Sequence, residues 1–221
     1  MPAKRRSRGS LRGTGSPFLR GVESLPEAFD AMAFPFNVRA FSHGIELTFR
    51  SKVTFFVGEN GSGKSTLLEA IAECCGFNPE GGNRDHHRAT LTDRSPLAKA
   101  IRLSRQSHGE SFLALFLHRF EQGIYILDEP EAALSPQRQL SFLRIIHDLT
   151  APGHAQFLIA THSPILLSYP DAVLYDLDGD SIRETTYRET KHFLITRDFL
   201  NAPEQFFKHL FATPEDLDPD G

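Results

Sequence analysis

The sequence predicts an α/β fold with a mostly parallel sheet and a small antiparallel β element. Three observations support this prediction: buried strands alternate with helices, polar or glycine-rich residues follow these strands, and two strands of alternating polarity precede them. Helices between strands return the chain to its starting edge, so such strands pair in parallel. With 221 residues, of which 40% are hydrophobic and 24% charged, the chain is long enough for one domain with a sizeable core.

The two ends of the chain differ in charge from the part between them. Residues 1–16 hold five basic side chains among glycine and serine, so we expect a disordered basic arm there. Residues 213–221 are acidic and contain proline, and we expect a disordered tail. The basic arm leaves nucleic acid open as a partner, but a net charge of −4 gives no global basic field in its support. We expect residues 17–212 to form a single domain.

The first part of this domain contains three predicted strands. Residues 36–41 and 44–49 alternate in polarity and are joined by a short link, which predicts an antiparallel pair. Residues 52–57 are β-branched and aromatic, as expected of a buried strand. A helix is expected from residue 66 to Cys75, with Gly76 as its C-cap.

A glycine-rich loop lies between this third strand and this helix, and it fits the pattern G-x-x-x-x-G-K-[ST] of a phosphate-binding P-loop. Glycines let the backbone turn tightly, so that N–H groups and the helix N-terminus point at phosphate oxygens. We expect Lys64 to reach the β- and γ-phosphates and Ser65 to ligate Mg²⁺. The alternative is a glycine-rich turn that binds nothing. The nucleotide-binding residues predicted in the loop are Gly58, Glu59, Asn60, Gly61, Ser62, Gly63, Lys64, Ser65 and Thr66.

The remaining predicted elements continue the alternation of helices and strands. We expect a polar surface loop at 78–94, helices at 96–105 and 112–120, a strand at 124–127, a helix at 136–149 and a strand at 156–160. A hairpin around Asp178 and Gly179 then joins 173–177 to 181–184, and a last helix, 201–211, is capped by Asn201.

Polar residues that can carry chemistry follow two of these strands. Asp128 and Glu129 come directly after an apolar strand. In P-loop enzymes an aspartate in this place holds Mg²⁺, and a neighbouring carboxylate can accept a proton from the attacking water. His162 follows another buried strand, and because ligands gather at the carboxyl ends of parallel strands, we expect it to face the same crevice as Lys64. The alternatives are a solvated turn for the acids and a structural role for the histidine.

Residues 107–111, Ser-His-Gly-Glu-Ser, open an apolar helix, where they can either meet an anion or simply cap the helix. In their order along the chain, these segments resemble the motifs of an ATP-binding-cassette (ABC) ATPase. The P-loop resembles Walker A, residues 124–129 resemble Walker B with its catalytic glutamate, and residues 107–111 resemble a variant signature motif. Residues 133–135 resemble the D-loop, and His162 resembles the switch histidine. The resemblance covers residues 36–184 and is strongest to the non-transporter branch of small ATPases related to chromosome-maintenance and recombination-repair ATPases.

This resemblance implies a P-loop NTPase with an ABC-type, RecA-like core, and ATP and Mg²⁺ as its ligands. It implies that Lys64, Glu129 and His162 are catalytic and that Ser65 and Asp128 hold the metal. It further implies a head-to-tail homodimer formed on ATP binding, with two ATP molecules between the subunits. The signature residues Ser107, Gly109 and Glu110 would then complete the nucleotide site of the opposite subunit.

Two features depart from the family pattern. The glutamine-containing loop of the family has no counterpart, because Gln106 is the only glutamine between Lys64 and the signature motif, which it adjoins. The stretch between Thr66 and Ser107 is also short, which implies a reduced helical subdomain. Two alternatives to an active ATPase remain. The missing glutamine loop favours a nucleotide-gated binding module with slow or no turnover. The other alternative is the energy-coupling subunit of a membrane transporter, against which the short helical region argues.

The composition also predicts a location in the cell. Cys74 and Cys75 are adjacent in a predicted helix and cannot form a disulfide framework, which is typical of a reducing compartment. No apolar run approaches the roughly 20 residues needed to span a bilayer, and no apolar segment follows the basic N-terminus as in a secretory signal. We therefore expect a cytoplasmic protein without a membrane span.

Overall fold

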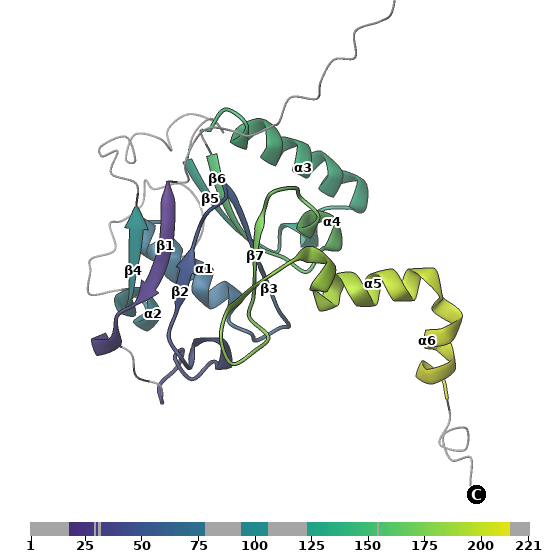
Figure 1. Cartoon of the computed structure of the whole chain (residues 1–221), viewed down its shortest axis with the longest axis horizontal. Coiled ribbons are helices and arrows are strands. Elements are labelled where there is room, and N and C mark those ends of the chain that lie inside the picture. Colours follow the sequence, from purple (N-terminus) through teal and green to yellow (C-terminus); the bar gives the residue numbers. More distant parts are fainter. Residues whose placement is uncertain are drawn as a thin grey trace, which may run out of the picture.

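Four parallel strands and one antiparallel strand form the larger of two sheets, here called the large sheet (Figure 1). The computed structural model describes residues 18–28, 30, 32–77, 94–105, 123–153 and 155–212. In the large sheet the strands follow the order β5-β6-β3-β7-β8, and only β8 runs antiparallel to its neighbour. The strands are β3 (Val53–Val57), β5 (Gly123–Asp128), β6 (Ala155–Ala160), β7 (Val173–Asp176) and β8 (Arg183–Thr185). This arrangement confirms the predicted α/β fold, including the hairpin formed by β7 and β8.

The second sheet, here called the small sheet, is antiparallel and has the order β2-β1-β4. Its strands are β1 (Leu19–Ser24), β2 (Glu46–Thr48) and β4 (Ile101–Arg105). The antiparallel element is thus confirmed, but the strand predicted at residues 36–41 is wrong, since these residues form a turn and the 3₁₀ helix η2 (Arg39–Phe41). Hydrogen bonds from Val38 N–H to Pro35 O (3.1 Å) and from Phe41 N–H to Val38 O (2.9 Å) satisfy this backbone locally. β1, which the sequence did not predict, pairs with β2 instead.

The helix predicted at residues 96–105 is correct only in its first half. α2 (Pro96–Ala100) begins after Ser95, whose Oγ accepts a hydrogen bond in the first turn. From residue 101 onward Ile101 and Leu103 face the core, whereas the residues that alternate with them are exposed. This period of two is that of a strand. Pairing of β4 with β1 therefore ends the helix.

Both faces of the large sheet are covered by other elements. α1 (Lys64–Cys75) and the small sheet share a hydrophobic core with one face, whereas α3 (Pro136–Thr150) and α4 (Pro164–Leu167) pack on the other face. Figure 1 shows these two sets of elements on opposite sides of the sheet. β3 is buried along its whole length, and its neighbouring residues Phe55 and Phe56 belong to different cores. The strand that leads into the P-loop therefore runs through the middle of the molecule.

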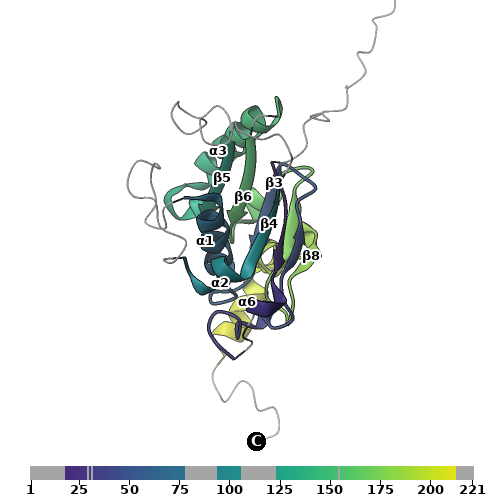
Figure 2. The same ribbon diagram turned by 90° about the vertical axis from the view of Figure 1, so that its left-hand side faces the viewer.

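The predicted helices on either side of the large sheet are confirmed, and Gly76 ends α1 with a left-handed φ of 81°, as expected. The C-terminal part differs from the prediction. Asn201 is the last residue of α5 (Lys191–Asn201) and not a cap, because Pro203 begins a separate helix, α6 (Pro203–Leu210). Neither α5 nor α6 contains a buried residue, and α6 lies at the opposite end of the molecule from α3 (Figure 2). Three further 3₁₀ helices are η1 (Pro26–Ala28), η4 (Pro130–Ala133) and η5 (Tyr187–Glu189).

Several predictions concern residues outside the described part of the chain. They are the basic arm, the acidic tail, residues 78–93 of the polar loop, Gln106, the motif at 107–111 and the helix at 112–120. Among the helices that are described, none combines the length and the hydropathy required to cross a membrane.

Candidate functional site

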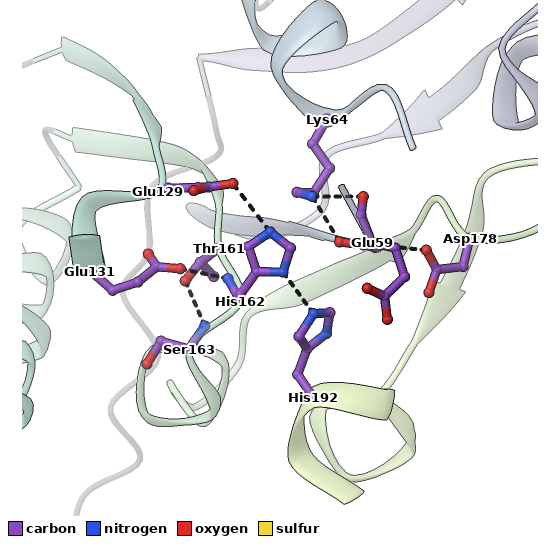
Figure 3. Close-up of polar contacts among 10 residues, drawn as sticks. Glu59, Lys64, Glu129, Glu131, Thr161, His162, Ser163, Asp178 and His192 are labelled. Atoms are coloured by element: carbon purple, nitrogen blue, oxygen red, sulfur yellow. Dashed lines mark hydrogen bonds and ion pairs between the residues drawn. The ribbon is translucent and has the colours of Figure 1, made fainter. Parts of the chain in front are cut away.

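The carboxyl ends of four parallel strands bring polar residues together at one edge of the large sheet. Gly58 follows β3, Glu129 follows β5, His162 lies two residues beyond β6, and Asp178 lies two residues beyond β7. Figure 3 shows the side chains of Lys64, Glu129 and His162 converging from the P-loop helix and two strand ends. The structure therefore brings together the three residues that the sequence predicts to be catalytic.

Glycine conformations shape the P-loop between β3 and α1. Gly58, Gly61 and Gly63 have φ values of 147°, 83° and 99°, which residues with a side chain rarely adopt. At Gly63 space is limiting as well, because a Cβ atom there would lie 2.7 Å from Phe41 Cζ. Gly63 is the N-cap of α1 and provides no side-chain hydrogen bond to its first turn. The N–H groups of that turn therefore keep their capacity to bind an anion.

Lys64 is buried at the start of α1, with only 4% of its surface exposed. Its Nζ donates hydrogen bonds to two carbonyl oxygens of the P-loop, Gly58 O at 2.7 Å and Glu59 O at 3.2 Å. Burial lowers the pKa of Lys64, while the nearby negative charges of Glu129 and Asp128 act in the opposite direction. Two donors of the ammonium group are thus bonded within the loop to which a phosphate would bind.

The other predicted nucleotide-binding residues of the loop differ in exposure. Glu59, Asn60 and Gly61 are exposed, whereas Ser62 and Thr66 are partly buried. Within the described part of the chain, Ser62 Oγ has no hydrogen-bond partner although the atom is buried. A buried hydroxyl without a partner is costly, so this loop has unused hydrogen-bonding capacity.

Glu129 has a left-handed backbone conformation, with φ 45° and ψ 53°. This conformation is strained for a residue with a side chain, and such strain is concentrated at functional sites. The N–H group of Glu129 donates a 2.9 Å hydrogen bond to Ala160 O at the end of β6, which holds the turn against the neighbouring strand. In this position Glu129 Oε1 lies 3.1 Å from His162 Nε2.

His162 is held by three groups. Its Nε2 contacts Glu129, its Nδ1 lies 2.7 Å from His192 Nε2, and its backbone N–H donates a 2.6 Å hydrogen bond to Glu131 Oε1. About a quarter of the side chain, 26%, remains exposed. The imidazole is therefore fixed at both ring nitrogens while part of it stays accessible from solvent.

Ser65 and Asp128, the predicted Mg²⁺ ligands, are both exposed at this edge of the sheet. Ser65 lies in the first turn of α1 and Asp128 is the last residue of β5. Their hydroxyl and carboxylate oxygens are the hard ligands that Mg²⁺ prefers, so the donor set fits this ion. The described residues contain no cluster of three or more His, Cys, Asp or Glu side chains suited to a metal, so water and phosphate oxygens would have to supply the other ligands.

Four residues of the site were missed by sequence reasoning: Glu131, Asp178, Lys191 and His192. Asp178 Oδ1 accepts a 2.6 Å hydrogen bond from Glu59 N–H, and its Oδ2 lies 3.1 Å from Lys191 Nζ. Burial would raise the pKa of Asp178, but these two hydrogen bonds outweigh burial and the pKa falls below its ordinary value. Asp178 follows a parallel strand and could have been found by that signal, whereas nothing in the sequence singles out Lys191 or His192.

The predicted signature residues Ser107, Gly109 and Glu110 lie outside the described residues. Their relation to the nucleotide site stays a prediction.

Comparisons with known proteins identify a family for most of the chain. A family model described as an AAA domain matches residues 36–215. No curated protein matches. Among the solved structures that match is the SMC head domain from Thermotoga maritima, with 16% sequence identity and a TM-score of 0.42, covering 76% of this chain and 98% of that chain.

Proposed function

This chain belongs to the AAA domain family, and we propose that it is an ABC-type ATPase that binds ATP and hydrolyses it to ADP and phosphate. The observation that supports this proposal is the convergence of Lys64 with the Glu129–His162 pair at one edge of the large sheet. A cation for the phosphates and a residue that positions the attacking water recur in enzymes that transfer phosphoryl groups, and an imidazole can donate a hydrogen bond where negative charge develops. The proposed ATPase domain spans residues 17–212.

ATP binding would use the Lys64 ammonium group, which now bonds within the P-loop, and the free N–H groups at the start of α1. Lys64 would exchange the carbonyl oxygens of Gly58 and Glu59 for oxygens of the β- and γ-phosphates. The uncapped first turn of α1 would donate N–H groups to the same phosphates. Ser65 and Asp128 would hold Mg²⁺, which supplies positive charge at the phosphate oxygens when bound.

Hydrolysis would depend on Glu129 and His162. Glu129 would orient a water molecule for in-line attack on the γ-phosphorus and accept its proton, as a carboxylate beside the metal ligand can. His162 Nε2 now lies 3.1 Å from Glu129 and would donate its hydrogen bond to the γ-phosphoryl group as charge develops there. These two side chains are close enough to act on the same phosphoryl group.

The proposed assembly is a head-to-tail homodimer closed by ATP. Ser107, Gly109 and Glu110 of one copy would contact the γ-phosphate bound to the other copy, as the resemblance to ABC ATPases implies. ATP would then bind the dimer better than the monomer and shift the association equilibrium. Light scattering on the Glu129→Gln protein should give a dimer with ATP and a monomer with ADP, and Ser107→Arg should abolish the dimer without loss of ATP binding. A Glu129→Gln protein that stays monomeric both with ATP and with ADP, at protein concentrations of roughly tens of micromolar, would contradict this assembly.

A steady-state turnover assay tests the hydrolytic function. Glu129→Gln should lower turnover by roughly 100-fold or more, the usual contribution of a positioned general base, while ATP affinity is retained. Glu204→Gln, which changes an exposed glutamate of α6, is the matched control and should behave as the parent protein. Turnover that is unchanged in Glu129→Gln would remove the catalytic role from this residue.

A second candidate function is a nucleotide-gated binding module with slow or no turnover. The absence of any glutamine other than Gln106 between Lys64 and the signature motif favours it, because the glutamine loop of ABC ATPases has no counterpart. The same assay separates the two functions. ATP-dependent dimerisation of the parent protein without measurable hydrolysis would favour the binding module.

A further inference from the structure

His192 contacts the candidate site from a part of the chain that carries no recognised motif. It lies in the first turn of α5, and its Nε2 is 2.7 Å from His162 Nδ1 (Figure 3). The two ring centroids are 4.7 Å apart and the ring planes are inclined by 60°. The 2.7 Å separation of the two nitrogens is at the short end for an N–H donor, so the two rings share a good hydrogen bond.

The direction of this hydrogen bond follows from the third group in the row. A carboxylate only accepts hydrogen bonds, so the contact between Glu129 Oε1 and His162 Nε2 places a hydrogen on Nε2. A neutral His162 then has a bare Nδ1, which must accept. His192 Nε2–H is the donor that Nδ1 faces. With His162 neutral, the hydrogen bonds run in one direction, from His192 to His162 to Glu129.

We propose that His192 is a positioning residue for His162: it fixes the tautomer with hydrogen on Nε2 and aims that hydrogen at Glu129 and at the bound γ-phosphate. The part of this inference that concerns the γ-phosphate rests on the proposed ATPase function. A histidine tautomer is set by the hydrogen bond made at its other nitrogen, and His192 supplies that bond here. Without it, His162 would divide between two tautomers, of which only one donates from Nε2.

The environment of His192 favours the neutral ring that this role needs. Burial lowers the pKa of His192, a proton on His162 would lower it further, and Lys64 acts in the same direction, while Glu59 and Asp178 act in the opposite direction. A neutral imidazole with hydrogen on Nε2 has one donor, and the geometry directs it at His162.

The start of α5 is itself anchored to the P-loop. Lys191 Nζ lies 3.1 Å from Asp178 Oδ2, and Asp178 Oδ1 accepts the 2.6 Å hydrogen bond from Glu59 N–H. Thr190, which is 2% exposed, caps the helix by accepting a hydrogen bond from Phe193 N–H. These contacts fix the backbone of the first turn of α5, which places the His192 ring beside His162.

Two substitutions in the full chain separate hydrogen-bond donation from packing. His192→Leu removes the donor, whereas His192→Gln keeps an N–H group in about the place of Nε2. We expect His192→Leu to lower kcat by about 10-fold, at the low end for loss of an orienting partner, with ATP affinity within about twofold of the parent. His192→Gln should recover most of this loss. His209→Leu, at an exposed histidine of α6, is the control.

Nitrogen-15 NMR of the imidazoles tests the inference without any turnover. In the parent protein and in His192→Gln, His162 should show the tautomer with hydrogen on Nε2, and in His192→Leu it should show a mixture; the resonance is assigned by its loss in His162→Asn. The same tautomer in all three proteins would overturn the role of His192, even if kcat falls. A protein that hydrolyses no ATP would overturn the proposed function, and the tautomer would still decide the role of His192.

Discussion

Three helices begin at the candidate site, and they begin in different ways. α4 follows Ser163 and α5 follows Thr190, and each hydroxyl accepts a hydrogen bond from an N–H group in the first turn, at 3.4 Å and 3.3 Å. α1 follows Gly63, which has no side chain to offer and a left-handed φ of 99°. In α4 and α5 the cap side chain accepts a hydrogen bond from an N–H group of the first turn, whereas in α1 no cap side chain does so.

This difference separates support from ligand binding. Ser or Thr at an N-cap stabilises a helix by about 1 kcal/mol relative to alanine, whereas Gly63 offers α1 no hydroxyl for such a hydrogen bond. Its free N–H groups and its positive partial charge are then available to a phosphate. Loss of the Lys64 ammonium group at the start of α1 should therefore affect nucleotide binding, whereas loss of the hydroxyls that cap α4 and α5 should affect stability.

Gly63→Ala should have the largest effect, because it changes both the conformation and the space at the start of α1. A left-handed φ costs a residue with a side chain about 1–2 kcal/mol, and the contact with Phe41 adds about 1–3 kcal/mol of overpacking. Denaturant unfolding should show the sum. Gly61→Ala is the matched control, since its φ is 83° but no atom of the described residues lies within 4 Å of a Cβ built there. Equal losses in the two variants would show that Phe41 does not limit the position.

Lys64→Ala should weaken ATP binding by about 1.5–3 kcal/mol, or roughly 10- to 150-fold, through loss of a charge-assisted contact. Titration with fluorescent ATP measures this change. Lys52→Ala is a suitable control, since Lys52 Nζ bonds Thr150 O at the opposite end of β3. Unchanged affinity in a folded Lys64→Ala protein would remove the P-loop assignment.

The start of α1 could be predicted from the sequence because its strand, loop and helix are contiguous. The acids after β5 and His162 after β6 could be predicted as well, because apolar runs that end in polar residues indicate strand ends at one edge of a parallel sheet. The contact of His192 with His162 could not, because His192 lies in a helix and follows no strand end. Asp178 does follow a strand end, but nothing in the sequence shows that its carboxylate reaches Glu59 N–H, 119 positions away.

Strand β1 shows a different limit of sequence reasoning. Gly21 and Glu23 lower the strand signal of this segment. The structure requires the glycine, because a Cβ at position 21 would lie 2.5 Å from Leu47 O of β2. The close approach of two strands thus selects a residue that weakens the local pattern. In the reverse case, residues 36–41 have a strand pattern but satisfy their backbone by local turns.

Ser163→Ala tests one of the capped helices and should lower the free energy of unfolding by about 1–2 kcal/mol. The hydroxyl accepts from Leu166 N–H and also donates a 2.5 Å hydrogen bond to the buried Gln139 Oε1, which would lose this donor. Ser135→Ala, at the exposed cap of α3, is the control and should cost less. A larger loss in Ser135→Ala than in Ser163→Ala would contradict this account.

The smallest effect concerns the other capped helix, α5, and depends on pH. Burial, the largest cause, lowers the pKa of His192 below its ordinary value of 6.5. Below pH 6.5 His192 of the unfolded chain therefore binds a proton, whereas His192 of the folded chain binds it only at a lower pH. The stabilising contribution of neutral His192 is complete above pH 6.5 and is lost as the pH falls towards the folded-state pKa.

His192→Gln removes this proton and isolates its contribution. Between pH 7 and pH 5.5 the free energy of unfolding of the parent should fall more steeply than that of His192→Gln. Because the ring is partly exposed, the difference should stay well below the one-proton limit of about 1.4 kcal/mol per pH unit. Urea unfolding at several pH values measures both slopes, with His209→Gln as the control for an exposed histidine. Since the remaining titratable groups are common to both proteins, equal slopes would mean that His192 takes up its proton as readily in the folded chain as in the unfolded one.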